Sequence, residues 1–476
     1  MNDIYQNPLC GRYASREMQH VFSADVKFST WRRLWVALAE AERELGLDIS
    51  EEQIAELREH INDIDYDKAK EYESKLRHDV MAHIHTYADA CPTAGGIIHL
   101  GATSCYVGDN TDIIVMREAL KLIRRKLINC IAATAAFAQK YKDTPTLAYT
   151  HFQAAQPTTA GKRATLWIAD LLSDLERLDF EIRSLRLLGC KGTTGTAASF
   201  FKLFDGDHVK VQQLERLIAK KMDFPGCVHV SGQTYSRKVD YNVLSVLGGI
   251  AQSAAKFSND IRLLSHLKEF DEPFEPGQVG SSAMAYKRNP MRSERIASLS
   301  RFVMVDVMNP AITAATQWFE RTLDDSANRR ISLPEAFLAT DGILSLYFNI
   351  ISGGTLYPNM MKRHLEEEMP FMATENILMY CVEQGGDRQE LHEAIRRHSV
   401  ATAKRIKLEG GDNDLLELIL ADPTFKLTRA ELDDIMQNSV FTGRATEQTE
   451  EFLRECVAPV LDANRDCLGI NVEITV

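Results

Sequence analysis

Apolar residues recur along most of this chain at spacings of three and four, which is the period of an amphipathic α-helix rather than of a strand. One such stripe predicts an uninterrupted helix from Lys238 to Leu267, ~45 Å long at ~1.5 Å per residue. Three more stripes predict helices over 120–138, 172–185 and 292–307. Convincing strand patterns are few. The sequence therefore predicts an all-α protein whose middle is a bundle of long helices.

Small residues interrupt these stripes, as at Gly248 and Gly249, and they permit close packing against more than one neighbour. We therefore expect other subunits to extend the bundle. Shorter helical patterns flank it: one runs from Phe28 to Leu45, and smaller amphipathic helices follow Pro358. These changes predict three domains, a helical N-terminal domain over 1–103, the bundle over 104–356 and a helical C-terminal domain over 357–476.

Composition limits the setting of the protein. A chain of 476 residues and 53.6 kDa is too long for one hydrophobic core. Its 55 Lys and Arg against 67 Asp and Glu leave a net charge of −12, which disfavours nucleic acid as a partner. Nine cysteines without a C-x-x-C pair favour the reducing cytosol. No targeting segment and no apolar run of ~18–20 residues is evident, so we expect a cytoplasmic protein without a membrane partner.

The stretch 280–290 concentrates reactive side chains in a loop between two predicted helices. It holds Ser281, Ser282, Lys287 and Asn289, bounded by Gly280 and Pro290. A solvated turn would use the same residue types. However, four cations lie between positions 287 and 295 against one acid, and a helix N-terminus adds positive potential. The loop is therefore a candidate site for a carboxylate or phosphate.

Two histidine segments are further candidates. His151 lies in a polar turn before a helix that begins near Thr158 or Thr159, where an imidazole could act as general acid or base. A lone histidine is more often structural. The segment 77–79 is followed by His83 and His85, but residues two apart on a helix do not share a face. We therefore expect no metal site there.

Three more polar segments remain open to two interpretations. The loop 99–110 could receive an anion or serve as a helix cap. Segment 191–196 has the residues of a phosphate loop without the Walker A pattern. Segment 318–330 is rich in paired acids and arginines, which suit bidentate binding of phosphate or carboxylate and suit an internal salt-bridge network equally well.

Together these segments resemble a known family. Gly280-Ser-Ser-Ala-Met, followed by Lys287-Arg-Asn-Pro290, is similar to the signature of the fumarase/aspartase superfamily of lyases. Within it, the segments around His99, His151, Gly232–Lys238 and Phe319–Arg330 resemble the adenylosuccinate lyases of the animal type, and the resemblance reaches 371–376 and 441–444. It implies an all-α, three-domain subunit, a homotetramer with active sites shared between subunits, and no cofactor.

The resemblance also implies a reaction and a set of site residues. The family cleaves fumarate from adenylosuccinate, giving AMP, and from SAICAR, giving AICAR, in purine nucleotide biosynthesis. Ser281 matches the general base and His151 the general acid; Lys287 would lower the serine pKa, and His78 would hold substrate or tune His151. The other residues expected to contact substrate are Arg12, Tyr13, Arg77, Asp79, Thr103, Ser104, Gln233, Ser282, Asn289, Arg295, Arg321, Ser326 and Arg330.

Two positions depart from the family pattern: Ala285 and Ala154 stand where proline is usual. Losing proline raises the entropy of an open loop, so we expect a less rigid enzyme rather than an inactive one. Rival interpretations are an argininosuccinate lyase or fumarase, a structural protein that keeps a lyase fold, and a nucleic-acid binder. The arginine-rich segment 321–330 and the motif 232–238 argue against the first rival. Intact His151, Ser281 and Lys287 argue against the second, and the net charge argues against the third.

Overall fold

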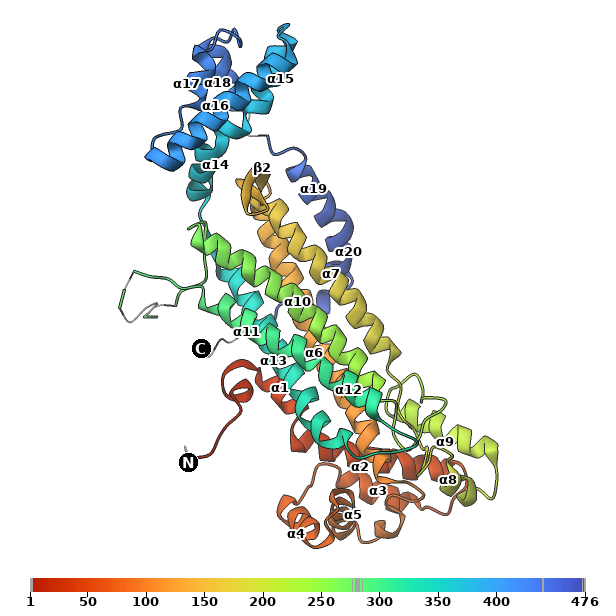
Figure 1. Ribbon diagram of the computed structural model, residues 1–476. Helices are drawn as coiled ribbons and strands as arrows, with labels where there is room; N and C mark the ends of the chain where they lie inside the picture. Colours follow the sequence, from red (N-terminus) through yellow and green to blue (C-terminus); the bar gives the residue numbers. More distant parts are fainter. Residues whose placement is uncertain are drawn as a thin grey trace.

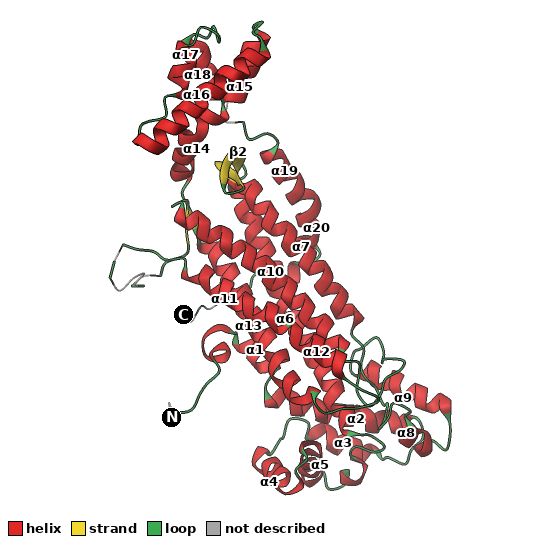
Figure 2. Ribbon diagram, viewed as in Figure 1, coloured by secondary structure: helices red, strands yellow, loops and turns green. Residues whose placement is uncertain are grey.

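A computed structural model describes residues 3–275, 277–278, 283–284, 286–438, 441–472 and 474. The described chain is almost entirely helical and elongated along a central bundle (Figures 1 and 2). The N-terminal elements are η1 (Leu9–Tyr13), α1 (Arg16–Val21), α2 (Ala24–Glu44), α3 (Glu51–Glu59), α4 (Tyr66–Leu76), α5 (Asp79–Ala90) and η2 (Gly95–Ile97). The prediction of an all-α fold is confirmed.

Five long helices form the bundle, and each packs along at least two of the others. They are α6 (Ser104–Lys140), α7 (Ala160–Ser184), α10 (Lys238–His266), α11 (Met291–Asp306) and α13 (Asp325–Gly353). Between them lie β1 (Pro145–Thr150), β2 (Gln153–Thr159), α8 (Ala198–Leu203), α9 (His208–Lys221), β3 (Phe270–Asp271), α12 (Met308–Thr316) and β4 (Thr355–Leu356). The predicted stripe of α10 is buried as expected, from Val243 through Ile250 and Phe257 to Leu264.

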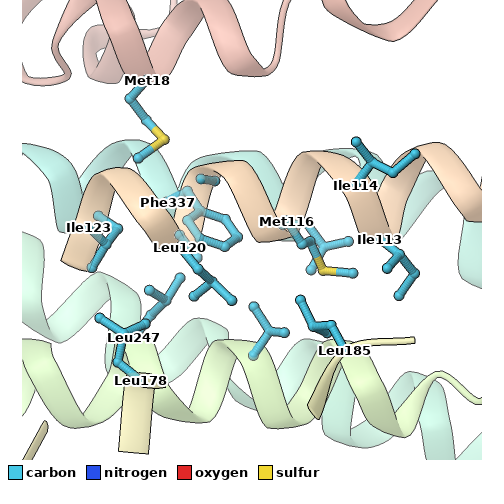
Figure 3. Close-up of a cluster of buried hydrophobic side chains, with 14 of the residues drawn as sticks. Met18, Ile113, Ile114, Met116, Leu120, Ile123, Leu178, Leu185, Leu247 and Phe337 are labelled. Carbon is cyan, nitrogen blue, oxygen red and sulfur yellow. The ribbon is translucent and has the colours of Figure 1, made fainter. Parts of the chain in front are cut away.

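The bundle core is apolar and continuous. Figure 3 shows Met18 from α1, Leu120 and its neighbours from α6, Leu178 from α7, Leu247 from α10 and Phe337 from α13 meeting in one cluster. The core extends to α2, where Trp35 is only 1% exposed. The N-terminal helices are therefore fixed to the same end of the bundle as the start of α6.

Helix α13 is long and apolar enough to cross a membrane by length and composition, with a hydropathy of 1.3 over a window that is 78% buried. No such segment was expected from the sequence, in which no apolar run of ~18–20 residues is evident. The helix packs against α6, α10 and α11, so burial among other helices accounts for its apolar character. A core helix of a soluble protein meets the same criterion.

The last part of the chain contains two groups of helices. The first, at the far end of the bundle, has its own apolar cluster and comprises α14 (Pro358–Met372), α15 (Thr374–Glu383), α16 (Arg388–Glu409), α17 (Leu415–Ala421) and α18 (Arg429–Asn438). The second packs back along α6 and α7 and comprises α19 (Ala445–Phe452), η3 (Leu453–Val457), α20 (Ala458–Asp462) and η4 (Arg465–Cys467). The three-domain division at 103 and 356 stays a prediction.

Candidate active site

A cleft of ≈ 710 Å³ opens where the first turns of α6 and α13 meet the N-terminal helices. Its walls combine apolar side chains with charged side chains of both signs. The predicted site residues that line it are Arg77, His78, Asp79, Ser104, Gln233, Arg321, Ser326 and Arg330. Thr103 is the residue before the first turn of α6, next to Ser104. The structure thus brings together nine predicted residues from four separate sequence segments.

His78 joins two helix ends at the cleft. It is the N-cap of α5, where its Nδ1 accepts a hydrogen bond from the backbone N–H of Met81 at 3.3 Å. Its Nε2 lies 3.3 Å from the Ser104 hydroxyl at the start of α6. The preceding residue, Arg77, ends α4 in the left-handed conformation with φ 53. This sharp turn presents Arg77, His78 and Asp79 to the cleft together.

An ion network lies beneath Arg321. Both oxygens of Asp325, which is fully buried, accept from Arg321 Nη1, at 2.9 and 3.0 Å, and one also accepts from Arg237 Nε at 2.6 Å. Arg237 in turn makes two hydrogen bonds to Asp109, at 2.9 and 3.2 Å. Burial alone would raise the pKa of Asp325, but Arg237 and Arg321 outweigh burial and lower that pKa. Asp325 therefore stays ionised and holds Arg321 at the cleft wall.

The segment 318–330 thus fits both interpretations that the sequence left open. Arg329 is buried and belongs to the network, with Nε bonded to Asp240 at 2.6 Å. Arg330 is exposed at the cleft and lies 3.8 Å from Asp79. Two adjacent arginines of this stretch thus differ in burial: Arg329 is paired in the buried network at the cleft wall, whereas Arg330 is exposed in the cleft.

Gln233 is placed by a close contact between two loops. A Cβ on Gly232 would lie 2.5 Å from the Glu320 carbonyl oxygen, so only glycine fits there. The Gln233 N–H donates to that same carbonyl at 2.9 Å, and its amide Nε2 donates to the Thr193 carbonyl at 3.1 Å. This contact aligns Gln233 with the arginine segment that follows Glu320.

His151 lies at the tip of the β1–β2 hairpin, at the other end of the bundle (Figure 1). His151 and Phe152 have φ values of 53 and 62 and form a two-residue turn between Thr150 and Gln153. His151 is exposed, and Phe152 is 79% exposed. The expected helix start is confirmed, since Thr159 caps α7. Ala154, at the usual proline position, pairs with Tyr149 in the hairpin.

A third group of predicted residues lies beside the middle of the bundle. Arg295 on α11 stands over the Tyr13 ring at 5.8 Å, and Arg12 is close enough to affect the Arg295 pKa, which burial lowers. Lys287 and Asn289 belong to the segment that leads into α11. Ser281 and Ser282 lie outside the described residues, as does Ala285.

The predicted residues therefore occupy three separate places in one chain. Helix α6 starts at the cleft with Ser104, extends ~55 Å at ~1.5 Å per residue over 37 helical residues and ends just before the hairpin, so its length separates His151 from Ser104. Proton transfer needs hydrogen-bond distances. One copy of the chain cannot bring His151 to its own cleft.

Several other candidates turn out to be structural. Lys191 donates to both carboxylate oxygens of Glu215 at 2.7 Å, so this cation of segment 191–196 is already paired. His83 is buried and stacks on Phe28, whereas His85 stacks on Tyr72, so the two imidazoles point to different neighbours. These contacts account for three of the side chains whose function the sequence left open.

Sequence reasoning missed the residues beneath the cleft. Arg237 lies in the family segment 232–238 and Asp109 in the loop 99–110, but the sequence predicted no role for either. Their partners are 88 and 128 residues away in sequence, and no spacing rule links such distances. No stripe in the sequence marked this pair, because Arg237 lies in the turn before α10 and Asp109 lies near the start of α6, ahead of the apolar stripe that begins at Leu120.

The fold of this chain occurs in known lyases. Two solved structures share the fold. A fumarate lyase from Mesorhizobium sp. BNC1 superimposes with a TM-score of 0.79 and 22% identity, over 95% of this chain and 100% of that chain. A 3-carboxy-cis,cis-muconate lactonizing enzyme from Pseudomonas putida superimposes with a TM-score of 0.80 and 22% identity, over 94% of this chain and 99% of that chain. A lyase family model matches residues 11–305. The protein thus has the all-α fold of the fumarase/aspartase lyases.

A second model, for the adenylosuccinate lyase C-terminus, matches residues 370–452. The adenylosuccinate lyase of Schizosaccharomyces pombe is 51% identical to this chain, over 96% of this chain and 95% of the relative. That of Saccharomyces cerevisiae is 52% identical over the same shares of the two chains, and that of Schistosoma mansoni is 47% identical over 99% of both chains. The chain belongs to the adenylosuccinate lyase family.

Proposed function

We propose that this protein is a carbon–nitrogen lyase that eliminates fumarate from adenylosuccinate, giving AMP, and from SAICAR, giving AICAR. The observation that carries the proposal is the cleft, in which the predicted residues Arg77, Arg321 and Arg330 converge with His78, Ser104 and Gln233, in a chain about half identical to adenylosuccinate lyases. Arginines suit the phosphate and two carboxylates of such substrates, and Gln233 suits an amide. We expect a cytoplasmic role in purine nucleotide synthesis, without cofactor, nucleic acid or membrane.

The elimination requires two proton transfers. The Ser281 oxygen removes the proton from the carbon beside a carboxylate, and the resulting carbanion is stabilised as an aci-carboxylate. The C–N bond then breaks, its electron pair stays on nitrogen, and His151 protonates that nitrogen. The role of Ser281 rests on the family resemblance, as does that of Ser282 as a substrate contact.

The charged residues have distinct tasks in this scheme. Serine is a weak base, and each unit by which its pKa falls needs ~1.4 kcal/mol of preferential stabilisation of the alkoxide. Lys287 supplies positive charge for this purpose, and Asn289 donates to the developing carboxylate. His78, held by Met81 and Ser104, orients the substrate.

We further propose that the active protein is a homotetramer in which each site combines a cleft, a β1–β2 hairpin and a signature loop, the stretch 280–290, from different subunits. The separation of His151 from the cleft along α6 supports it. So do the exposed apolar side chains on α11 and α12, where Phe302 is 40%, Val305 71%, Met308 56% and Ile312 58% exposed. Apolar patches of this kind mark interfaces.

The test of the reaction is direct. Purified protein is incubated separately with adenylosuccinate, SAICAR and argininosuccinate, and fumarate is followed by absorbance. Fumarate from the first two substrates and none from the third supports the assignment; fumarate only from argininosuccinate, or from no substrate, contradicts it. Sedimentation should give a mass four times that of the 53.6 kDa chain.

A further inference from the structure

The hairpin that carries His151 is an arm whose base is fixed by close backbone packing. A Cβ on Gly161 would lie 2.4 Å from the Ala138 carbonyl oxygen and 2.6 Å from Lys142 Cα, so the start of α7 touches the end of α6 directly. The N–H groups of Ala160 and Gly161 donate to the carbonyls of Thr144 and Tyr141, both at 2.9 Å. Movement at the tip must therefore arise within the strands rather than at their base.

A side chain from α7 holds the outer edge of β1. In the β1–β2 ladder, Leu147 is opposite Pro157, and the register shifts between Leu147 and Tyr149. The Leu147 carbonyl accepts a hydrogen bond from Arg163 Nη2 at 2.7 Å. A bulge bends a strand and redirects the residues beyond it. Arg163 therefore fixes β1 where the strand turns toward His151.

The side chain of Leu147 is held by apolar contacts with another helix, α14. The Leu147 side chain is 2% exposed and packs in a cluster with Leu365 and Met369 of α14. Figure 2 shows the hairpin at the end of the bundle, beside α14. One residue of β1 is thus held by its carbonyl from α7 and by its side chain from α14.

Arg163 is itself held in an electrostatic pocket. Its Nη1 atom is buried without a hydrogen-bond partner among the described residues, and the carboxylates of Glu269 and Asp260 attract the guanidinium electrostatically. Glu269 is fully buried and lies 2.8 Å from His364 Nδ1 of α14. Burial lowers the pKa of Arg163, and the two carboxylates oppose that effect. The two carboxylates therefore favour the charged guanidinium that donates to the Leu147 carbonyl.

We propose that Arg163 is a positioning residue for His151: by anchoring the Leu147 carbonyl, it sets where the hairpin presents the imidazole to the site of a neighbouring subunit. The inference rests on the proposed function, in which His151 is the general acid. Displacing a catalytic group by about 1 Å can cost ~10²-fold in rate, and general acid catalysis contributes ~10²–10⁴-fold. The expected effect falls on turnover, because the cleft residues that bind substrate are at the other end of the bundle.

The first test compares three variants under steady-state conditions. Arg163→Gln should lower kcat at least ~10-fold with KM within ~3-fold of the parent, since an acid acts on the transition state more than on substrate binding. Arg163→Lys keeps the charge and a donor, so it should recover part of the loss. Arg177→Met removes an exposed arginine further along the same helix and should leave both constants unchanged. If Arg163→Gln merely lowers the melting temperature while kcat per folded tetramer is unchanged, the inference is wrong.

The second test assigns Arg163 to one part of the shared site. Co-refolded Arg163→Gln and Ser281→Ala chains should exceed the summed activity of the separate variants, because some sites combine an intact hairpin with an intact Ser281. Arg163→Gln with His151→Ala should show no such gain, since both defects lie in one hairpin. Equal gains in the two mixtures would overturn the inference. The His151→Ala with Ser281→Ala mixture is the control: its failure counts against shared sites, and the kinetics of Arg163→Gln then decide the inference alone.

Discussion

At the scale of single residues, the charged side chains inside this protein follow two patterns. Beneath the cleft, Asp325 and Arg237 are buried as partners and remain ionised. Glu42 is different: it is fully buried in α2, and both carboxylate oxygens are without a hydrogen-bond partner among the residues that the structure describes. Burial raises its pKa to about 9. Glu42 is therefore protonated in the folded protein at neutral pH.

This makes the stability of the folded protein depend on pH in a defined direction. The pKa of Glu42 is near 4.5 in the unfolded chain and about 9 in the folded protein. Between these two pH values the folded state binds one more proton than the unfolded state, so the free energy of unfolding falls as pH rises, by up to ~1.4 kcal/mol per pH unit. Glu42→Gln removes the titration, and its melting temperature relative to the parent should rise steadily from about pH 5 to about pH 8. Glu44→Gln, an exposed residue of the same helix, is the control. A difference in melting temperature between Glu42→Gln and the parent that does not change with pH would contradict this account.

At the scale of elements, helix α11 begins without a local cap, and a distant carboxylate takes that place. Its N-cap, Pro290, makes no side-chain bond. Instead, Glu272 accepts from the N–H groups of Arg292 and Ser293, at 2.9 and 2.7 Å, and from the Ser293 hydroxyl at 2.6 Å. An anion at a helix N-terminus satisfies its free donors and its dipole. Glu272 thus ties the chain before the signature loop to the helix after it.

Removing this cap should destabilise α11 locally. Glu272→Ala is expected to cost about 2–4 kcal/mol, because it leaves buried donors without an acceptor. Glu275→Ala is a matched control, since Glu275 is exposed and its side chain makes a 3.2 Å ion pair with Arg292, of the kind worth ~0–1 kcal/mol. Hydrogen exchange of the amides at 292 and 293 should accelerate strongly in the first variant and little in the second. Similar exchange in both would show that Glu272 is not the cap.

Much of the element arrangement could be predicted because it depends on periodicity. The stripe from Lys238 to Leu267 became α10, which ends at His266, and the pattern from Phe28 became α2, which starts earlier because Ser23 caps it. The hairpin of His151 was foreseen only as a polar turn. Its short strands contain Pro157 and a bulge, which leave no clean alternation to read. The pairing of Arg237 with Asp109 depends on tertiary contact and could not be predicted.

At the scale of the whole molecule, an elongated bundle separates the parts of the proposed site, so the proposed shared site makes activity depend on assembly. Val305 on α11 is 71% exposed in the single chain. A buried interface would not tolerate an unpaired charge at this position. We therefore expect Val305→Glu to weaken assembly and to lower fumarate release in parallel, with little loss of helical signal in circular dichroism. A fully active Val305→Glu monomer in sedimentation would contradict the shared-site proposal.

The central claim is that His151 of one subunit works with the signature loop of another. His151→Ala and Ser281→Ala chains are each expected to release almost no fumarate from adenylosuccinate. When the two are unfolded, mixed in equal amounts and refolded together, about one quarter of the sites in random tetramers should hold both intact residues. The account predicts fumarate release near that fraction of the parent rate. Mixed tetramers that demonstrably contain both chains and remain inactive would contradict it.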